Sequence, residues 1–535
     1  MSSIALGLIV LGVIYLLYNT WPLYRNWKRA RRLGMPVIVS PVTTGSLLWL
    51  VVVYSIRHGS IPTYLHRLPY VRVMRISWSV QEKQAVHKEL GKLFIRVTPT
   101  DCELFVADRV LAKQILQRRD DFQKPRQMME MLNTFGTSLA LVDGTDWQRH
   151  RKVTGRAFHE KMHQRVWIES SKYASSIVNQ WSTTESVRST RSDMTTLSLY
   201  VLFKTCLGID AGEGIESGEI LAADIAACQY HLTAFLEGIS RPPTLRRGRM
   251  VWDELDKNRK ALGELLREIV QARRWSSRKP QPDLLSSMIA STDDYELTPD
   301  EITGNLFLFI FAGHETTANT LIFIIHLLAI MPIWQDWARE EVDQLPQRSD
   351  VSEGLGYQDA FPSMVRLRAI LYETLRLYGP VPTVVRKTNN QDQLVRFEDE
   401  DVVIPKGTNV FINTIAMHTD PEQWGSDPLA WRPDRWISQG PGSGSTEQLR
   451  SDMTKNLFSW GDGPRICPGQ KFSQIEVLAV LLSLLKNHHV GVVPRPDQTL
   501  DVARSCAYKL IQNSKMGLTL HMPDAESVSL RWTHR

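Results

Sequence analysis

The longest apolar stretch of the chain follows a strong helix start and predicts a single long, buried helix. Thr298 can cap the N-terminus of this helix, Pro299 suits its first position, and Glu301 can close a capping box. The residues then stay mostly apolar as far as Ile330, and Pro332 ends the pattern. Because apolar side chains lie on nearly every side, we expect this helix to run through the core.

One polar island interrupts the long helix, at Ala312-Gly-His-Glu-Thr-Thr317. Burying a carboxylate and hydroxyls is costly unless hydrogen-bond partners or a function compensate. One interpretation is a satisfied kink without chemistry, in which Thr316 bonds back to a helix carbonyl and Gly313 opens a groove. The other is a proton relay, because Glu315 places a carboxyl group next to that hydroxyl.

Helical spacing dominates most of the remaining chain, and strand-like alternation is confined to short stretches. Residues 160–290 form a pattern of charged and apolar helical segments. Alternation over 94–106 and again over 394–416 predicts short strands beside the helices. The expected fold class is therefore mainly α with a small β portion, and we assign 57–535 to a single domain.

The N-terminus predicts a membrane anchor. Residues 4–18 carry no charge, and the apolar stretch continues through Trp21 and Tyr24, approaching the ~20 residues that span a bilayer. A cleaved signal peptide is the rival interpretation, but no basic region precedes the stretch and no clear cleavage site follows it. We therefore expect residues 1–24 to be an uncleaved transmembrane anchor.

Basic residues directly follow the predicted anchor, and they set its orientation. They are Arg25, Lys28, Arg29, Arg31 and Arg32. By the positive-inside rule the rest of the chain faces the cytosol. We expect 25–56 to be a basic, proline-containing linker with a second apolar run at 47–54. This run is too short to span a bilayer and could be buried core, a second anchor half or an amphipathic patch resting on the membrane.

Composition and cysteine count narrow the class of protein. The 535 residues are 43% hydrophobic and 22% charged, which is ordinary for a globular chain. The net charge of +6 comes without an aromatic-basic stripe or a nucleic-acid module, so no nucleic-acid partner is expected. The five cysteines are odd in number and include no Cys-x-x-Cys pair, which argues for a reducing compartment and against a disulfide framework or a zinc site.

A glycine-rich run near the C-terminus delivers one cysteine to the start of a helix. The run is Trp460-Gly-Asp-Gly-Pro-Arg-Ile-Cys-Pro-Gly469, and helical apolar spacing follows it at once. Cys467 therefore sits where backbone N–H groups and the positive end of a helix converge, a setting that favours a thiolate. A thiolate with one open face suits axial ligation of haem iron, so Cys467 is the candidate metal ligand.

Five positions of this run resemble, at the same spacing, the haem-binding signature of the cytochrome P-450 family. They are Trp460, Gly463, Arg465, Cys467 and Gly469, with Trp460 standing where the family usually has Phe. The resemblance implies the family's helix-rich fold around a buried haem b with an axial cysteine thiolate. It covers roughly residues 94–520, and its finer likeness is to microsomal fungal members that act in secondary metabolism.

The resemblance also assigns roles to other residues. In the polar island, Thr316 becomes the hydrogen-bond donor in oxygen activation and Glu315 the proton shuttle, while His314 falls at a variable position. Trp147 and Arg151 resemble the family's Trp-x-x-x-Arg, and Arg386 and Arg465 join them as groups that reach the haem propionates. Without the resemblance, Trp147 and Arg151 would predict a solvated basic helix.

Three further residues resemble the family's supporting frame for the cysteine loop. Glu373 and Arg376 lie three apart on one helical face with apolar neighbours, and a buried pair of this kind needs further hydrogen bonds. Arg435, in Trp431-Arg-Pro-Asp-Arg-Trp436, can supply them. We expect these three residues to be structural.

The resemblance implies a membrane-bound haem-thiolate monooxygenase that inserts one oxygen atom from O2 into a lipophilic small molecule. Its electrons would come from NADPH through cytochrome P-450 reductase, with cytochrome b5 as a second candidate donor. We expect a single-pass protein of the endoplasmic reticulum with its catalytic domain in the cytosol. A haem-thiolate isomerase or dehydratase that needs no external electrons is the alternative enzyme, and a haem-binding sensor is the alternative outside enzymes.

Overall fold

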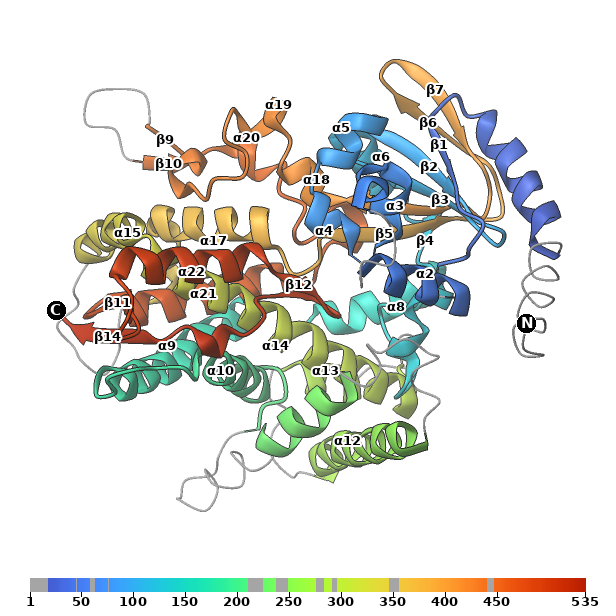
Figure 1. Cartoon of the computed structure of the whole chain (residues 1–535). Helices are drawn as coiled ribbons and strands as arrows, with labels where there is room; N and C mark the ends of the chain where they lie inside the picture. The colour runs from blue at the N-terminus through green and yellow to red at the C-terminus, as the bar shows by residue number, and fades with distance from the viewer. Residues whose placement is uncertain are drawn as a thin grey trace.

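The computed structural model describes residues 18–44, 46–57, 63–75, 77–209, 225–236, 249–275, 283–290, 296–345, 356–439 and 447–535. Helices make up most of this part of the chain, as the sequence predicted. The long helices gather in one half of the molecule, and the main sheet with several short helices forms the other half (Figure 1). The predicted fold class, mainly α with a small β portion, is confirmed.

The centre of the helical half is α14 (Pro299–Ile330), the helix that the apolar pattern predicted. Thr298 caps it through the amide of Glu301, and the Glu301 side chain returns the bond, so the capping box is formed. The helix ends before α15 (Pro332–Gln344), which begins at the predicted proline. Most side chains of α14 are buried on all sides because other helices pack around it.

The helices that surround α14 belong to one continuous apolar core. α10 (Thr190–Thr205) packs along α14, and α9 (Glu160–Ser182) packs against α21 (Gln470–Leu485), the helix that follows the cysteine loop. Also in contact with α14 are α12 (Arg249–Trp275), α13 (Leu284–Ile289), α17 (Val365–Tyr378) and α22 (Leu500–Gln512). A further helix covers 225–236.

Six short strands form the main sheet in the order β1-β2-β3-β8-β5-β4. They are β1 (Val37–Val39), β2 (Leu93–Val97), β3 (Cys102–Val106), β8 (Asn409–Asn413), β5 (Thr383–Thr388) and β4 (Phe122–Gln123). β1 pairs parallel to β2 and β3 parallel to β8, while the other neighbours are antiparallel. The sheet thus joins segments that are more than 300 residues apart in the sequence.

The smaller elements complete the sheet half and the loops. They are η1 (Thr63–Arg67), α3 (Pro69–Met74), α4 (Trp78–Glu82), α5 (Ala85–Leu90), α6 (Arg109–Gln117), α7 (Arg126–Met129), η2 (Glu130–Asn133), α8 (Gly144–Gly155), α16 (Tyr357–Ser363), β6 (Gln393–Phe397), β7 (Glu400–Ile404), α18 (Thr414–His418), α19 (Pro421–Trp424), η4 (Pro433–Trp436), β9 (Ile437–Gln439), β10 (Glu447–Leu449), α20 (Ser451–Thr454), η5 (Gly463–Arg465), β11 (His488–Val492), β12 (Lys515–Met516), β13 (Leu520–His521), η6 (Ala525–Ser527) and β14 (Leu530–His534).

The N-terminal segment is only partly described. Residues 1–17, most of the predicted anchor, lie outside the described residues, and 18–31 form a helix. Within 25–56, where we expected a linker, β1 joins the main sheet and Asn26 donates to the carbonyl of Thr98 at 3.0 Å. The apolar run at 47–54 lies in α2 (Leu47–Arg57), with Trp49 packed against the core and Val51 exposed.

Among the described residues, one helix is long and apolar enough to cross a bilayer, and that helix is α14. Most of it is buried inside the protein.

Candidate functional site

The cysteine loop is closed by backbone hydrogen bonds and shaped by two glycines. Gly461 and Gly463 have φ angles of +77° and +71°, which L side chains rarely adopt. The amide of Cys467 donates to the carbonyl of Trp460 at 2.9 Å, which closes the loop. Cys467 thus lies between η5, which ends at Arg465, and the first turn of α21, where Gly469 is the N-cap residue.

Cys467 presents its thiol on an open side and is crowded on the others. Its side chain is exposed, and a Cβ at Gly469 would lie 3.9 Å from Sγ. Burial among protein atoms raises the pKa of the Cys467 thiol, although the amide of Gly469 and the Arg151 cation act to lower it. The start of the helix and the Arg151 cation thus favour the thiolate against burial, and a bound metal ion would favour it further.

The flanks of the loop are tied to neighbouring helices. Ser459 donates to the carbonyl of Leu375 in α17 at 3.0 Å, and the amide of Phe458 donates to Nε2 of His418 at 3.0 Å. The indole N–H of Trp460 donates to Oγ of Ser473 in α21 at 3.1 Å. The Trp side chain thus has a hydrogen bond that Phe could not make.

The structure brings the three expected frame residues together. Glu373 and Arg376 are completely buried in α17, and their bidentate pair has distances of 2.7 and 2.8 Å. Arg435 donates to Glu373 Oε1 at 2.9 Å, and Trp436 donates to Oε2 at 2.9 Å. Arg376 also donates to the carbonyl of His418, the residue whose ring holds Phe458. The frame therefore reaches the cysteine loop through one intermediate residue.

The polar island of α14 does not bring Glu315 and Thr316 into contact. The hydroxyl of Thr316 donates to the carbonyl of Ala312 at 2.8 Å, the back-bond expected of a helix hydroxyl. The carboxylate of Glu315 instead accepts from Thr519, 204 residues away in the sequence. A Cβ at Gly313 would lie 3.0 Å from the side chain of Leu202 in α10, so this glycine lets the two helices approach.

His314 is a core residue in this structure. It is 4% exposed, its Nδ1 lies 2.7 Å from the carbonyl of Ile310, and burial lowers its pKa to about 4. The histidine is therefore neutral and bonded within its own helix, which agrees with its place at a variable position of the motif.

Buried cations gather beside the cysteine loop. Arg465 lies 5.0 Å from the ring of Trp147 and donates to the carbonyl of Val142 at 2.9 Å and to the carboxylate of Asp143, while its Nε has no hydrogen-bond partner within the described part of the chain. Arg386 is 3% exposed in β5, and its side chain donates to the carbonyl of Val385. Burial, together with repulsion by Arg465, lowers the pKa of Arg386 to about 10.

Two more cations complete this group. Arg151 lies on α8, one turn after Trp147, and burial lowers its pKa while the nearby Cys467 thiolate would raise it. Lys124 was missed by the sequence analysis, since a lone lysine in Phe122-Gln-Lys-Pro125 carries no helical spacing or charge pattern. Burial lowers its pKa well below the ordinary value, and Arg386 and Arg465 lower it further.

These residues fit a haem. Asp143 is the acidic neighbour that Lys124, Arg386 and Arg465 share among the described residues, and Asp120 acts on Arg465 as well, so the cluster carries more positive charge than its carboxylates balance. Unbalanced buried cations are costly unless an anion pairs with them, and the propionates of a haem are anions of that kind. The open Sγ of Cys467 and the exposed Ala312 in the middle of α14 offer accessible surface that a planar group would cover.

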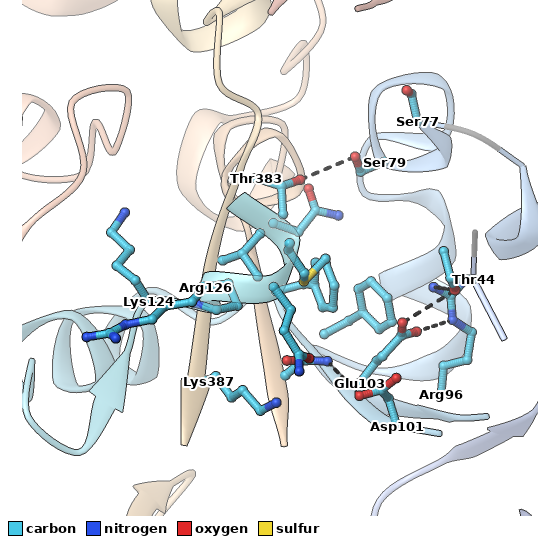
Figure 2. Close-up of a pocket in the computed structure, with 18 of the residues that line it drawn as sticks. Thr44, Ser77, Ser79, Arg96, Asp101, Glu103, Lys124, Arg126, Thr383 and Lys387 are labelled. Atoms are coloured by element: carbon cyan, nitrogen blue, oxygen red, sulfur yellow. Dashed lines mark hydrogen bonds and ion pairs between the residues drawn. The ribbon is translucent and has the colours of Figure 1, made fainter. Parts of the chain in front are cut away.

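A cavity of about 920 Å³ lies between the sheet and the short helices (Figure 2). Lys124 and Arg126 lie on one side of it, and the Arg96–Glu103 ion pair lies on the other. Cys467 and Thr316 do not line this cavity. It meets the cation cluster at Lys124 and Asp143 and the hairpin of β12 and β13 at Met516, so it borders the site without containing the cysteine.

A helix-rich fold with an open cysteine before a core helix and unbalanced cations beside it defines a haem-thiolate protein. The family model described as Cytochrome P450 matches residues 72–515, so the chain belongs to the cytochrome P450 family. The protein is accordingly an oxidoreductase of the cytochrome P450 monooxygenase family.

Relatives of known name agree with this assignment. The chain is 27% identical to a cytochrome P450 monooxygenase of Arthrobotrys oligospora over 99% of this chain and 98% of the relative. It is also 27% identical to the phomenoic acid biosynthesis cluster cytochrome P450 monooxygenase of Leptosphaeria maculans, over 96% and 97%. Retinoic acid bound cyanobacterial CYP120A1 shares the fold, with a TM-score of 0.66, 18% identity, and 85% and 96% coverage.

Replacing Gly463 with Ala should damage the cysteine loop more than the same change at Gly461. Both glycines have positive φ, which costs an L residue about 1–3 kcal/mol. A Cβ at Gly463 would in addition lie 2.5 Å from the carbonyl oxygen of Leu116, whereas one at Gly461 meets nothing within 4 Å. We expect Gly463→Ala to lose most bound haem and Gly461→Ala to keep it, measured by haem content per folded protein. Equal losses in the two variants would contradict the close approach to Leu116.

Replacing Lys124 with Met should have opposite effects with and without haem. Without haem, the change removes a repelled cation, so the midpoint of thermal unfolding should rise. With haem, it removes a charge-assisted hydrogen bond of about 1.5–3 kcal/mol, so haem transfer to an excess apo-globin should be about tenfold faster. Lys88→Met, at an exposed position, is the matched control and should change neither quantity. A lower midpoint of thermal unfolding for Lys124→Met without haem would contradict an excess of positive charge in the cluster.

Proposed function

We propose that the protein is a membrane-anchored haem-thiolate monooxygenase that inserts one oxygen atom from O2 into a lipophilic small molecule. The observation that carries the proposal is the cluster of buried and half-buried cations that outnumber their acidic neighbours, Asp143 and Asp120, beside an open cysteine. Cys467 would bind the iron, and Trp147, Arg151, Arg386, Arg465 and Lys124 would hold the propionates. When bound, the haem supplies the redox chemistry of oxygen activation.

The side chains of the polar island would manage protons near the haem. Thr316 keeps its hydroxyl proton on the carbonyl of Ala312 in this structure, and a rotation about its side chain would turn the proton toward the exposed face of α14. Glu315 would resupply that hydroxyl through water, because burial raises the pKa of its carboxyl and favours the protonated form. General acid chemistry of this kind contributes roughly 10²–10⁴-fold to a rate.

The relatives support a role in secondary metabolism. The Leptosphaeria maculans relative is named for the phomenoic acid biosynthesis cluster, and the Arthrobotrys oligospora relative is also fungal. We infer a lipophilic substrate of a biosynthetic pathway, with electrons from NADPH through cytochrome P450 reductase and with cytochrome b5 as a second donor. A haem-thiolate isomerase or dehydratase is the alternative, and it would consume no NADPH.

The apolar residues at the N-terminus support membrane anchoring. Residues 4–18 carry no charge and the basic residues from Arg25 to Arg32 follow them. On the helix at 18–31, Tyr18, Trp21 and Tyr24 are 81%, 70% and 50% exposed, at the spacing of one helical face. Aromatic side chains on such a face suit a membrane interface. We place the protein in the endoplasmic reticulum membrane as a single-pass protein, with its catalytic domain in the cytosol.

Removing residues 2–17 should release the protein from membranes. The full chain should stay with the microsomal pellet after a carbonate wash, because hydrophobic burial holds an anchor independently of surface charge. The shortened chain should move to the supernatant and keep its haem, since the cut leaves the helix at 18–31 whole. An unrelated uncharged apolar segment of the same length should restore sedimentation. A shortened chain that stays in the pellet would place the anchor elsewhere.

Replacing Thr316 with Ala should uncouple oxygen consumption from product formation. The haem and its thiolate ligand remain, so the red-shifted spectrum of the reduced carbon monoxide complex should be kept, whereas Cys467→Ala should abolish it. Product formed per NADPH oxidised should fall about tenfold or more. Thr320→Ala is the matched control, because Thr320 makes the same 2.8 Å back-bond one turn further along α14.

Two outcomes would count against this function. Normal coupling in the Thr316 variant would remove the hydroxyl from the proton path. Turnover of a hydroperoxide by the purified protein, with no NADPH consumed for any substrate tested, would favour the isomerase or dehydratase.

A further inference from the structure

The carboxylate of Glu315 is held by a chain of hydrogen bonds from the C-terminal part of the molecule. Nδ2 of Asn319 donates to Oγ1 of Thr519 at 3.0 Å, and the Thr519 hydroxyl donates to Oε1 of Glu315 at 2.8 Å. Asn319 and Thr519 are 5% and 4% exposed. Because the amide fixes the direction of the hydroxyl proton, Oε1 of Glu315 is an acceptor and a carboxyl proton must lie on Oε2.

The second oxygen of Glu315 is buried and has no hydrogen-bond partner among the described residues. Burial raises the pKa of this carboxyl, while the bond from Thr519 and the Arg191 cation of α10 lower it. Arg191 is itself paired with Glu526 at 3.0 Å. A proton on Oε2 would therefore have no acceptor among the described residues and would be available for transfer.

Thr519 belongs to a hairpin that reaches both Glu315 and the cavity. It lies in the turn between β12 (Lys515–Met516) and β13 (Leu520–His521), and its carbonyl accepts from Gly517 at 3.0 Å. The amide of Leu520 donates to the carbonyl of Pro380 at 2.8 Å, which fixes the hairpin beside the segment before β5. Met516, at the other side of the same turn, lines the cavity together with Thr383.

We propose that Thr519, oriented by Asn319, is a positioning residue that holds Oε1 of Glu315 and leaves Oε2 free to pass a proton toward Thr316. This inference rests on the proposed role of Glu315 as proton donor. It adds that the hairpin of β12 and β13 sets the orientation of that donor. A substrate in contact with Met516 would therefore touch the same hairpin that holds the acid of α14. No new bond is formed or broken in the holding step, and the transferred proton is resupplied from water.

Three variants of the full-length haem protein test this inference. Thr519→Val keeps the shape of the side chain and removes the hydroxyl, Thr519→Ser keeps the hydroxyl, and Glu315→Gln removes the acid. The first readout is the infrared band of the protonated Glu315 carboxyl in the resting protein, assigned by subtracting Glu315→Gln and titrated with pH. The second is product formed per NADPH oxidised, measured across the same pH range.

The hydrogen bond from Thr519 determines the direction in which the titration midpoint of the Glu315 carboxyl should shift. The Thr519 hydroxyl stabilises the carboxylate, so its loss should move the infrared titration midpoint upward by about half to one pH unit. Coupling in Thr519→Val should fall about threefold or more, and its decline at high pH should move upward with the midpoint. Thr519→Ser should restore both quantities to the wild-type values.

The outcomes separate this inference from the proposed function. If Glu315→Gln lowers coupling and Thr519→Val leaves both the midpoint and the coupling unchanged, the positioning role of Thr519 is wrong while the proton donor stands. If Glu315→Gln couples normally, the donor role itself is wrong. A loss in Thr519→Val that Thr519→Ser fails to restore would assign Thr519 to packing alone and overturn the inference.

Discussion

The buried carboxylate of Glu373 is the constraint on which the site depends. It accepts hydrogen bonds from the side chains of Arg376, Arg435 and Trp436 and from the backbone amide of Arg432. A completely buried carboxylate is tolerated only when its oxygens are satisfied by donors of this number and charge. Because the donors come from α17 and from the segment before and within η4, the carboxylate fixes both segments in one arrangement. Arg376 then connects this arrangement to the carbonyl of His418, whose ring orients the entrance of the cysteine loop.

The sequence predicted the parts of the molecule whose signals are local. The capping box and the apolar run located α14, and the spacing from Trp460 to Gly469 located the cysteine loop, since both signals lie within a single segment. It could not predict the partner of Glu315, because Thr519 reaches it from a hairpin 204 residues further along the chain. It also could not find Lys124, whose role comes from the burial of Arg386 and Arg465 around it. Residues 25–56 were expected to be a linker because they begin with a basic cluster and contain Pro36 and Pro41, whereas the pairing of β1 with β2 depends on a strand more than 50 residues away.

The thiol and the cations of the site are each unfavourable without the group that they would bind. Burial raises the pKa of Cys467, and it lowers the pKa of Lys124 and of Arg386. All three shifts oppose the charged form that a haem requires, a thiolate for the iron and cations for the propionates. Binding of the haem must therefore offset the cost of charging these groups, and its iron and propionates supply the opposite charges that do so. The hydrogen bonds around Glu373 keep the cysteine loop in place although the thiol and the cations are unfavourably placed without haem.

The polar island of α14 also contains a group that the protein leaves incompletely satisfied, in this case an acid that could transfer a proton. Its groups divide into those satisfied within the helix and those satisfied from outside. His314 and Thr316 bond back to carbonyls of their own helix, so their positions depend on α14 alone. Glu315 depends on Thr519, and its other carboxyl oxygen has no hydrogen-bond partner among the residues that the structure describes. The orientation of this buried acid is therefore set from outside the helix that carries it. A change at the neighbouring cavity would reach the island through Glu315, since Met516 of the same hairpin lines that cavity.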